Sequence, residues 1–175
     1  MNSLANWITL IRIILIPWFT ILLINGDLNQ ALWVFLAAAV SDALDGFVAR
    51  VFSQKTRLGS FLDPIADKLL LSTAFITLAI MNQIPGWLTV IVISRDVVIV
   101  IGVAVLFLNQ LRLDIKPSIV SKLTTACQAL LIVIILASGY LQWAPWVKPG
   151  IVYLTLLLTV VSGLHYLYSG LRTIT

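Results

Sequence analysis

The sequence predicts an all-α, polytopic membrane protein with six transmembrane helices. Of its 175 residues, 61% are hydrophobic and only 10% are charged, whereas a soluble domain carries about 25% charged residues. A membrane-spanning helix needs about 20 predominantly apolar residues. Six segments meet this requirement: Trp7–Ile24, Gln30–Val51, Gly59–Ile80, Gly86–Leu108, Pro117–Ser138 and Val147–Leu171. We therefore expect one membrane domain that covers residues 1–175.

The breaks between these segments contain turn-forming residues. Asn25-Gly26-Asp27 separates the first two segments, residues 82–86 mark the break before and at the start of the fourth, and residues 144–150 mark the break before and at the start of the sixth. The connections Phe52–Leu58 and Asn109–Lys116 are instead polar and basic. The first segment lacks a basic start and a small-residue cleavage site, so we expect it to be retained as a helix.

The positions of the basic residues predict that both termini are cytoplasmic. Lys and Arg are enriched in the cytoplasmic loops of membrane proteins. Here they gather around the second and fourth connections, whereas the first and third connections have none and the fifth has only Lys148. Tryptophans lie near the opposite helix ends, where an aromatic belt is expected. They are Trp33, Trp87, Trp143 and Trp146.

Four of the seven acidic residues, which are all aspartates, lie between positions 42 and 67. Ionisable side chains inside a membrane are costly and mark functional sites by default. Asp42 and Asp45 share one helical face because they are three residues apart, and Asp63 and Asp67 share another at a spacing of four. The connection between the two helices is short. We therefore expect antiparallel neighbours whose carboxylates meet in a polar cavity on the cytoplasmic side.

Four converging carboxylates favour a divalent-metal site. Without cations among them, repulsion would protonate at least one. Oxygen ligands suit Mg²⁺, Mn²⁺ or Ca²⁺, and two such ions about 3.5–4 Å apart form a clamp for displacement at phosphorus. Small residues at Gly46, Ala49 and Gly59 would let a ligand approach, and the fork of Arg50 suits a phosphate. The alternative, simple pairing of an aspartate with Arg50 or Lys68, would explain one or two carboxylates but not four.

These residues form the pattern Asp42-x2-Asp45-Gly46-x2-Ala49-Arg50-x8-Gly59-x3-Asp63-x3-Asp67. The pattern resembles the complete signature of the CDP-alcohol phosphatidyltransferase family. The segment Asn6-Trp-Ile-Thr9-Leu-Ile-Arg12 also resembles the first-helix motif of that family. Six spans with cytoplasmic termini are typical of its architecture, so the resemblance covers nearly the whole chain. It implies a membrane enzyme that transfers a phosphatidyl group from CDP-diacylglycerol to an alcohol and releases CMP.

The resemblance also implies a role for each signature residue. Asp42, Asp45, Asp63 and Asp67 would ligate two Mg²⁺ (or Mn²⁺) ions, and Asp67 would also be the general base. The residues implied to bind the CDP moiety are Asn6, Thr9, Gly46, Ala49, Arg50, Thr56 and Gly59. By the same resemblance we expect a homodimer in a bacterial-type inner membrane, with no nucleic-acid partner.

The acceptor alcohol depends on cations outside the signature. An intramembrane arginine should face the bundle interior, so we predict that Arg95, Lys116 and Lys122 bind a phosphate-bearing acceptor. The alternatives are an internal Arg95–Asp96 ion pair and ordinary cytoplasmic lysines.

Two groups within the family compete as the nearest resemblance. Residues 58–70 and 162–170 resemble phosphatidylglycerophosphate synthases, which use glycerol 3-phosphate, and this acceptor is the first choice. Residues 93–97 and 116–122 resemble cardiolipin synthases, which use phosphatidylglycerol. A cation transporter or channel is a remote alternative, and the sequence shows no inverted repeat to favour it.

Overall fold

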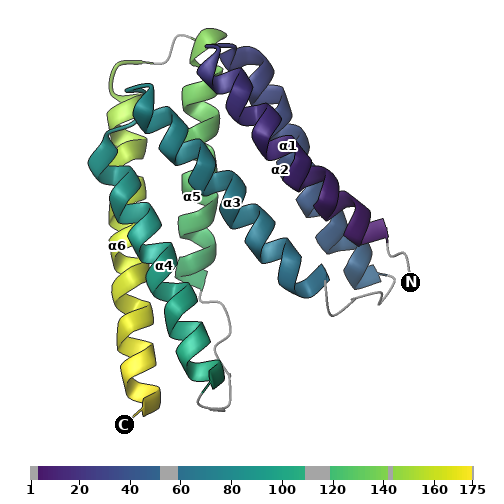
Figure 1. The fold of residues 1–175 in the computed structure, drawn as a ribbon. Helices are drawn as coiled ribbons and strands as arrows, with labels where there is room; N and C mark the ends of the chain where they lie inside the picture. The colour runs from purple at the N-terminus through teal and green to yellow at the C-terminus, as the bar shows by residue number, and fades with distance from the viewer. Residues whose placement is uncertain (1–3, 52–58, 109–118, 142–143, 175) are drawn as a thin grey trace.

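The computed structural model describes residues 4–51, 59–108, 119–141 and 144–174, with side chains for 13–41, 67–102, 119–141, 144–166 and 168. The described residues form α-helices and one 3₁₀ turn, with no strand among them, so the predicted all-α class is confirmed (Figure 1). The elements are α1 (Leu4–Ile24), α2 (Leu28–Val51), α3 (Gly59–Ile80), α4 (Gly86–Leu108), α5 (Ile119–Leu136), η1 (Ala137–Gly139) and α6 (Val147–Ile174).

The observed helices follow the predicted segments closely. The limits of α3 and α4 equal the predicted ones, whereas α1, α2 and α6 are a few residues longer. The predicted fifth segment ends differently, because its last residue, Ser138, lies in the 3₁₀ turn η1 and its Oγ donates a hydrogen bond of 2.7 Å to the carbonyl of Ile135.

Successive helices run in opposite directions (Figure 1). The starts of α1, α3 and α5 and the ends of α2, α4 and α6 lie toward one end of the molecule, at the bottom of the view. The α1–α2 turn, the α3–α4 turn and η1 lie at the other end. Both termini of the chain are therefore at the same end as the aspartate-bearing parts of α2 and α3.

Two packed groups of helices meet around α5 and α3. Helix α1 packs against α2 and α3, and α6 packs against α4 and α5. Helix α5 also contacts α2 and α3, and α3 contacts α4. The core includes Phe19 and Phe35, whose ring centroids are 5.8 Å apart, together with Phe75 and Leu131. Because α1 contacts both α2 and α3, it fixes the two helices that carry the signature.

The turns after α1 and α3 end their helices with the same pattern of backbone hydrogen bonds. The amide of Gly26 donates to the carbonyl of Leu23 and that of Asp27 donates to Leu22, which satisfies carbonyls that the helix leaves open. This bond pattern requires a left-handed residue, and Gly26 has a φ of 80°. Asn82 takes the same position after α3 with a φ of 56°. Asn tolerates this conformation better than most residues with a side chain.

The outer surface of the described helices is rich in apolar side chains. Two helical stretches, Ile119–Gly139 and Val147–Tyr166, are long and apolar enough to cross a membrane, with mean hydropathies of 2.1 and 1.7. Shorter apolar stretches occupy Ile13–Ile24 and Leu28–Ser41. Trp33, Trp87 and Trp146 are exposed near the starts of α2, α4 and α6, which lie at the end of the molecule opposite the termini (Figure 1), and Trp143 lies outside the described residues. This surface fits a lipid environment, since large exposed apolar areas are rare on soluble monomers.

Candidate active site

The four signature aspartates lie on two helix segments at one end of the molecule. Asp42 and Asp45 belong to the last part of α2, and Asp63 and Asp67 to the first turns of α3. The side chain of Asp67 is described, whereas those of Asp42, Asp45 and Asp63 lie outside the described set. The structure therefore places the helices that carry the predicted metal ligands, and the ligand geometry stays a prediction.

The predicted CDP-binding residues also fall outside the described side chains. Thr56 and the predicted acceptor residue Lys116 lie in segments that the structure does not describe. Helical backbone carries the remaining predicted CDP contacts, which are Asn6, Thr9, Gly46, Ala49, Arg50 and Gly59. Their positions on α1, α2 and α3 put them at the same end of the molecule as the aspartates.

A cavity of about 470 Å³ opens between α2, α3 and α5. Asp67 lines it from α3, and Lys122 lines it from α5. The structure thus brings together the predicted general base and one of the predicted acceptor-binding residues. The complete lining consists of Phe35, Ala39, Asp67, Leu70, Leu71, Ser121, Lys122, Thr125, Ala126 and Ala129.

The lining of this cavity changes from polar to apolar along the helices. Asp67 lies near the start of α3, and Ser121 and Lys122 lie near the start of α5. One turn after Asp67, α3 contributes Leu70 and Leu71 to the wall. One to two turns after Lys122, α5 contributes Ala126 and Ala129, and Phe35 lines the cavity from α2. A turn of α-helix advances about 5.4 Å. The cavity can therefore hold a molecule with a charged head and an apolar tail.

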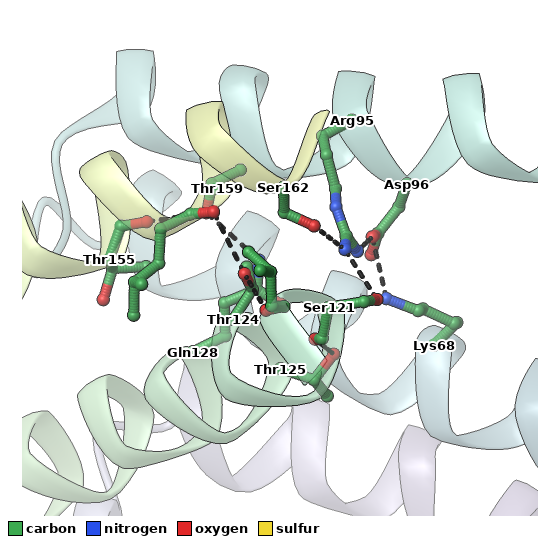
Figure 2. A network of polar contacts seen from close by, with 12 residues as sticks. Lys68, Arg95, Asp96, Ser121, Thr124, Thr125, Gln128, Thr155, Thr159 and Ser162 are labelled. Atoms are coloured by element: carbon green, nitrogen blue, oxygen red, sulfur yellow. Dashed lines mark hydrogen bonds and ion pairs between the residues drawn. The ribbon is translucent and has the colours of Figure 1, made fainter. Parts of the chain in front are cut away.

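Arg95 on α4 is buried and does not line this cavity, but it is bonded to Ser121 of the α5 wall (Figure 2). Its side chain is 4% exposed, and its Nη1 donates to Asp96 Oδ1 at 2.7 Å. Its Nη2 donates to Ser121 Oγ at 2.8 Å and also to Ser162 Oγ. The ring of Tyr166 lies 5.9 Å from its guanidinium carbon. The internal Arg95–Asp96 pair is therefore present, and Arg95 reaches the cavity through Ser121, a residue of its lining.

Asp96 has a second cationic partner that the sequence analysis missed. The ammonium of Lys68 lies 2.7 Å from the same Oδ1 atom that Arg95 contacts. From the sequence, Lys68 is expected only as an alternative ion-pair partner for one of the signature aspartates. A signal was available: an aspartate within an apolar segment needs neutralising charge, and Lys68 is on the helix that precedes α4. What the sequence could not give is which faces of α3 and α4 meet.

A row of buried polar side chains joins α5 to α6 beside this network (Figure 2). Thr124 Oγ1 donates across the helix interface to the carbonyl of Leu158, with an oxygen–oxygen distance of 3.0 Å. Gln128 Nε2 donates to Thr159 Oγ1 at 3.4 Å. Interhelical hydrogen bonds of this kind contribute to association where lipid removes the hydrophobic driving force. This row could not be identified from the sequence, because single Thr and Gln residues in apolar segments have no distinctive spacing.

Comparison with known proteins agrees with this arrangement. The sequence profile of the CDP-alcohol phosphatidyltransferase family matches residues 2–161. A probable phosphatidylglycerophosphate synthase of Mycobacterium tuberculosis is 35% identical over 98% of this chain and 83% of its own length. The CDP-diacylglycerol–glycerol-3-phosphate 3-phosphatidyltransferase of Escherichia coli is 33% identical over 96% of this chain and 94% of its own. The human cardiolipin synthase (CMP-forming) is 33% identical over 98% of this chain and 63% of its own.

The chain therefore belongs to the CDP-alcohol phosphatidyltransferase family. The family resemblance that the signature residues indicated is confirmed, and the protein is a phosphatidyltransferase.

Proposed function

We propose that this enzyme transfers the phosphatidyl group of CDP-diacylglycerol to glycerol 3-phosphate, forming phosphatidylglycerophosphate and CMP. The observation that carries the proposal is the cavity that Asp67 and Lys122 share, with one polar end and one apolar end. The polar part suits a phosphate-bearing acceptor, and the apolar part suits an acyl chain of the donor. Relatives from M. tuberculosis and E. coli that carry the corresponding names support the same acceptor.

The reaction would be a direct displacement at phosphorus. The acceptor hydroxyl oxygen forms a bond to the phosphorus that carries diacylglycerol, and the bond from that phosphorus to the CMP oxygen breaks. CMP leaves with the bonding electrons, and the hydroxyl proton passes to the Asp67 carboxylate, which acts as general base. Lys122 would hold the acceptor phosphate together with Lys116. Arg95 would support the acceptor site indirectly, because it donates a hydrogen bond to Ser121 in the cavity wall.

The donor set of the signature fits two divalent cations. Asp42, Asp45, Asp63 and Asp67 offer only carboxylate oxygens, which are the ligands that Mg²⁺ and Mn²⁺ prefer. Bound ions would neutralise the diphosphate and stabilise the charge that develops on the departing CMP. We further propose that the CDP moiety contacts Asn6, Thr9, Gly46, Ala49, Arg50, Thr56 and Gly59.

The enzyme would span the membrane six times as a homodimer, with the active site and both termini in the cytoplasm. Three observations support this topology: the alternating helix directions, the common end for both termini, and the exposed tryptophans near the other end. In a bacterial inner membrane, this arrangement would give the soluble substrate glycerol 3-phosphate access to Lys122.

The test is an acceptor survey with the purified protein. Radiolabelled CDP-diacylglycerol and Mg²⁺ are incubated with glycerol 3-phosphate, phosphatidylglycerol, serine or inositol phosphate in separate reactions, and the lipid products are identified. We expect phosphatidylglycerophosphate from glycerol 3-phosphate, and no product when a chelator removes divalent cations. If no acceptor yields a labelled lipid, the proposal of transfer from CDP-diacylglycerol is wrong.

Cardiolipin synthesis is the second candidate, because the human cardiolipin synthase matches 98% of this chain at 33% identity. In that reaction the hydroxyl of phosphatidylglycerol would attack the same phosphorus. Formation of cardiolipin as the main product in the survey would replace glycerol 3-phosphate with phosphatidylglycerol as the acceptor and leave the class of reaction unchanged.

A further inference from the structure

A continuous chain of polar contacts joins two of the helices that line the active-site cavity, α3 and α5, by way of α4 (Figure 2). It begins on α3 with Lys68, the residue that follows Asp67, and passes through Asp96 and Arg95 on α4. It ends on α5 at Ser121, which precedes Lys122 and lines the cavity itself. The chain therefore joins the wall that carries the proposed base to the wall that carries the proposed acceptor residue.

Because Lys68 and Asp67 are consecutive residues of α3, a contact that fixes Lys68 also affects the direction in which Asp67 points. Consecutive residues of an α-helix point about 100° apart, since a turn holds 3.6 residues. Asp67 lines the cavity while Lys68 reaches Asp96 on α4 at 2.7 Å. An ion pair on one face of α3 thus limits rotation of the helix that would turn Asp67 away from the cavity.

The two ends of the Lys68–Asp96 pair differ in their environment. The Lys68 side chain is 33% exposed, whereas that of Asp96 is 10% exposed and also neutralises the buried Arg95. Loss of Asp96 would leave a buried guanidinium without its carboxylate, a strongly destabilising change. Loss of the Lys68 ammonium leaves the Arg95–Asp96 pair in place. Lys68 is therefore the position at which the orienting effect can be separated from general stability.

We propose that Lys68 is a positioning residue of the transferase, which through Asp96 and Arg95 holds Asp67 in register with Lys122 across the cavity. The proposal rests on the role of Asp67 as general base. Small displacements of a reacting group reduce the rate steeply, by up to about 100-fold for 1 Å. The effect should therefore appear in kcat, since Lys68 is not among the residues that line the cavity and substrate binding is assigned to other residues.

The test compares Lys68→Met with Lys68→Arg and with the control Lys148→Met. Lys148 is an exposed lysine in the first turn of α6, at the other end of the molecule. We expect Lys68→Met to lower kcat about 10-fold, with the KM for both substrates within about twofold of the parent. Lys68→Arg, which can still pair with Asp96, should recover most of the activity, and Lys148→Met should behave like the parent.

Two results would overturn the proposal. One is an unchanged kcat in Lys68→Met, and the other is a raised KM for the acceptor at constant kcat, which would make Lys68 a substrate contact. An active Asp67→Asn variant would instead refute the proposed base, which keeps the two failures distinct.

Discussion

Asp67 on α3 and Lys122 on α5 face one cavity although they are 55 residues apart in the sequence. A carboxylate and an ammonium that line the same cavity can act on different parts of one acceptor molecule. The carboxylate can take a hydroxyl proton, while the ammonium can hold a phosphate some bonds away. We therefore expect substitution of Asp67 to affect turnover and substitution of Lys122 to affect the KM for the acceptor.

Asp67→Asn should abolish turnover while preserving the fold. Asn has nearly the same shape as Asp but cannot accept the proton of the acceptor hydroxyl, and a general base contributes about 10²–10⁴-fold to rate. CMP release from CDP-diacylglycerol, with glycerol 3-phosphate as acceptor, measures the effect. Size-exclusion behaviour in detergent should match that of the parent. A fully active variant would show that Asp67 is not the base.

Lys122→Met should weaken acceptor binding selectively. A hydrogen bond to a charged group contributes about 1.5–3 kcal/mol, so we expect the KM for glycerol 3-phosphate to rise about 10-fold or more. The KM for CDP-diacylglycerol should change little, because its diphosphate is assigned to other residues. Lys148→Met removes an exposed lysine far from the cavity and is the matched control. An unchanged acceptor KM would remove Lys122 from the acceptor pocket.

Ala129→Phe should make the enzyme sensitive to the length of the donor acyl chain. Ala129 lines the apolar interior of the cavity, and a phenyl ring there would fill space that we assign to an acyl chain. Activity with long-chain CDP-diacylglycerol should fall several-fold more than activity with short-chain donor. Ala37→Phe, at an exposed position of α2 outside the cavity lining, should not discriminate between donors. Equal losses with both donors would argue against acyl-chain binding here.

A reporter at the C-terminus should lie in the cytoplasm. Green fluorescent protein fused after residue 175 is expected to fluoresce, and alkaline phosphatase at the same position is expected to be inactive. Alkaline phosphatase fused after Gln83, in the α3–α4 turn at the other end of the molecule, should be active. The physical reason is the concentration of Lys and Arg near the connections on the terminal side. The opposite pattern would reverse the proposed orientation.

The helices could be predicted well because each is set by local sequence. Apolar runs of sufficient length and turn residues such as Asn82 and Gly86 delimit α3 and α4. The end of α5 was predicted less accurately, since the 3₁₀ turn that contains Ser138 has no distinctive composition. The position of Asp67 in the first turns of α3 also followed from the sequence, because its spacing of four from Asp63 and the start of the apolar segment at Gly59 both place it there.

The contacts between helices could not be predicted in the same way. Lys68 and Asp96 are 28 residues apart, and their pairing depends on which faces of α3 and α4 meet. Arg95 could be expected to point inward, but its bonds to Ser121 and Ser162 require the relative positions of α4, α5 and α6. A buried charge predicts that partners exist, whereas only the packed arrangement identifies them.

Thr124→Val should reduce the stability of the α5–α6 pair without affecting catalysis. Val keeps the shape of Thr but removes the hydroxyl that donates to the Leu158 carbonyl across the interface. Interhelical hydrogen bonds in membrane proteins contribute about 0.6 kcal/mol on average and up to about 1.7, so a loss within this range is expected in the free energy of unfolding. The measurement is reversible unfolding in mixed detergent micelles.

Thr20→Val is the matched control for this change. The Thr20 hydroxyl donates to the Ile16 carbonyl of its own helix, at 2.8 Å, as Thr124 also does to Val120. The Thr124 hydroxyl shares its one proton between the Val120 and Leu158 carbonyls, so both variants lose an intrahelical bond of this kind and only Thr124→Val also loses the contact with Leu158. If Thr20→Val lowers the free energy of unfolding as much as Thr124→Val, the loss belongs to the intrahelical bond, and the bond from Thr124 to Leu158 has no measurable part in holding α5 and α6 together.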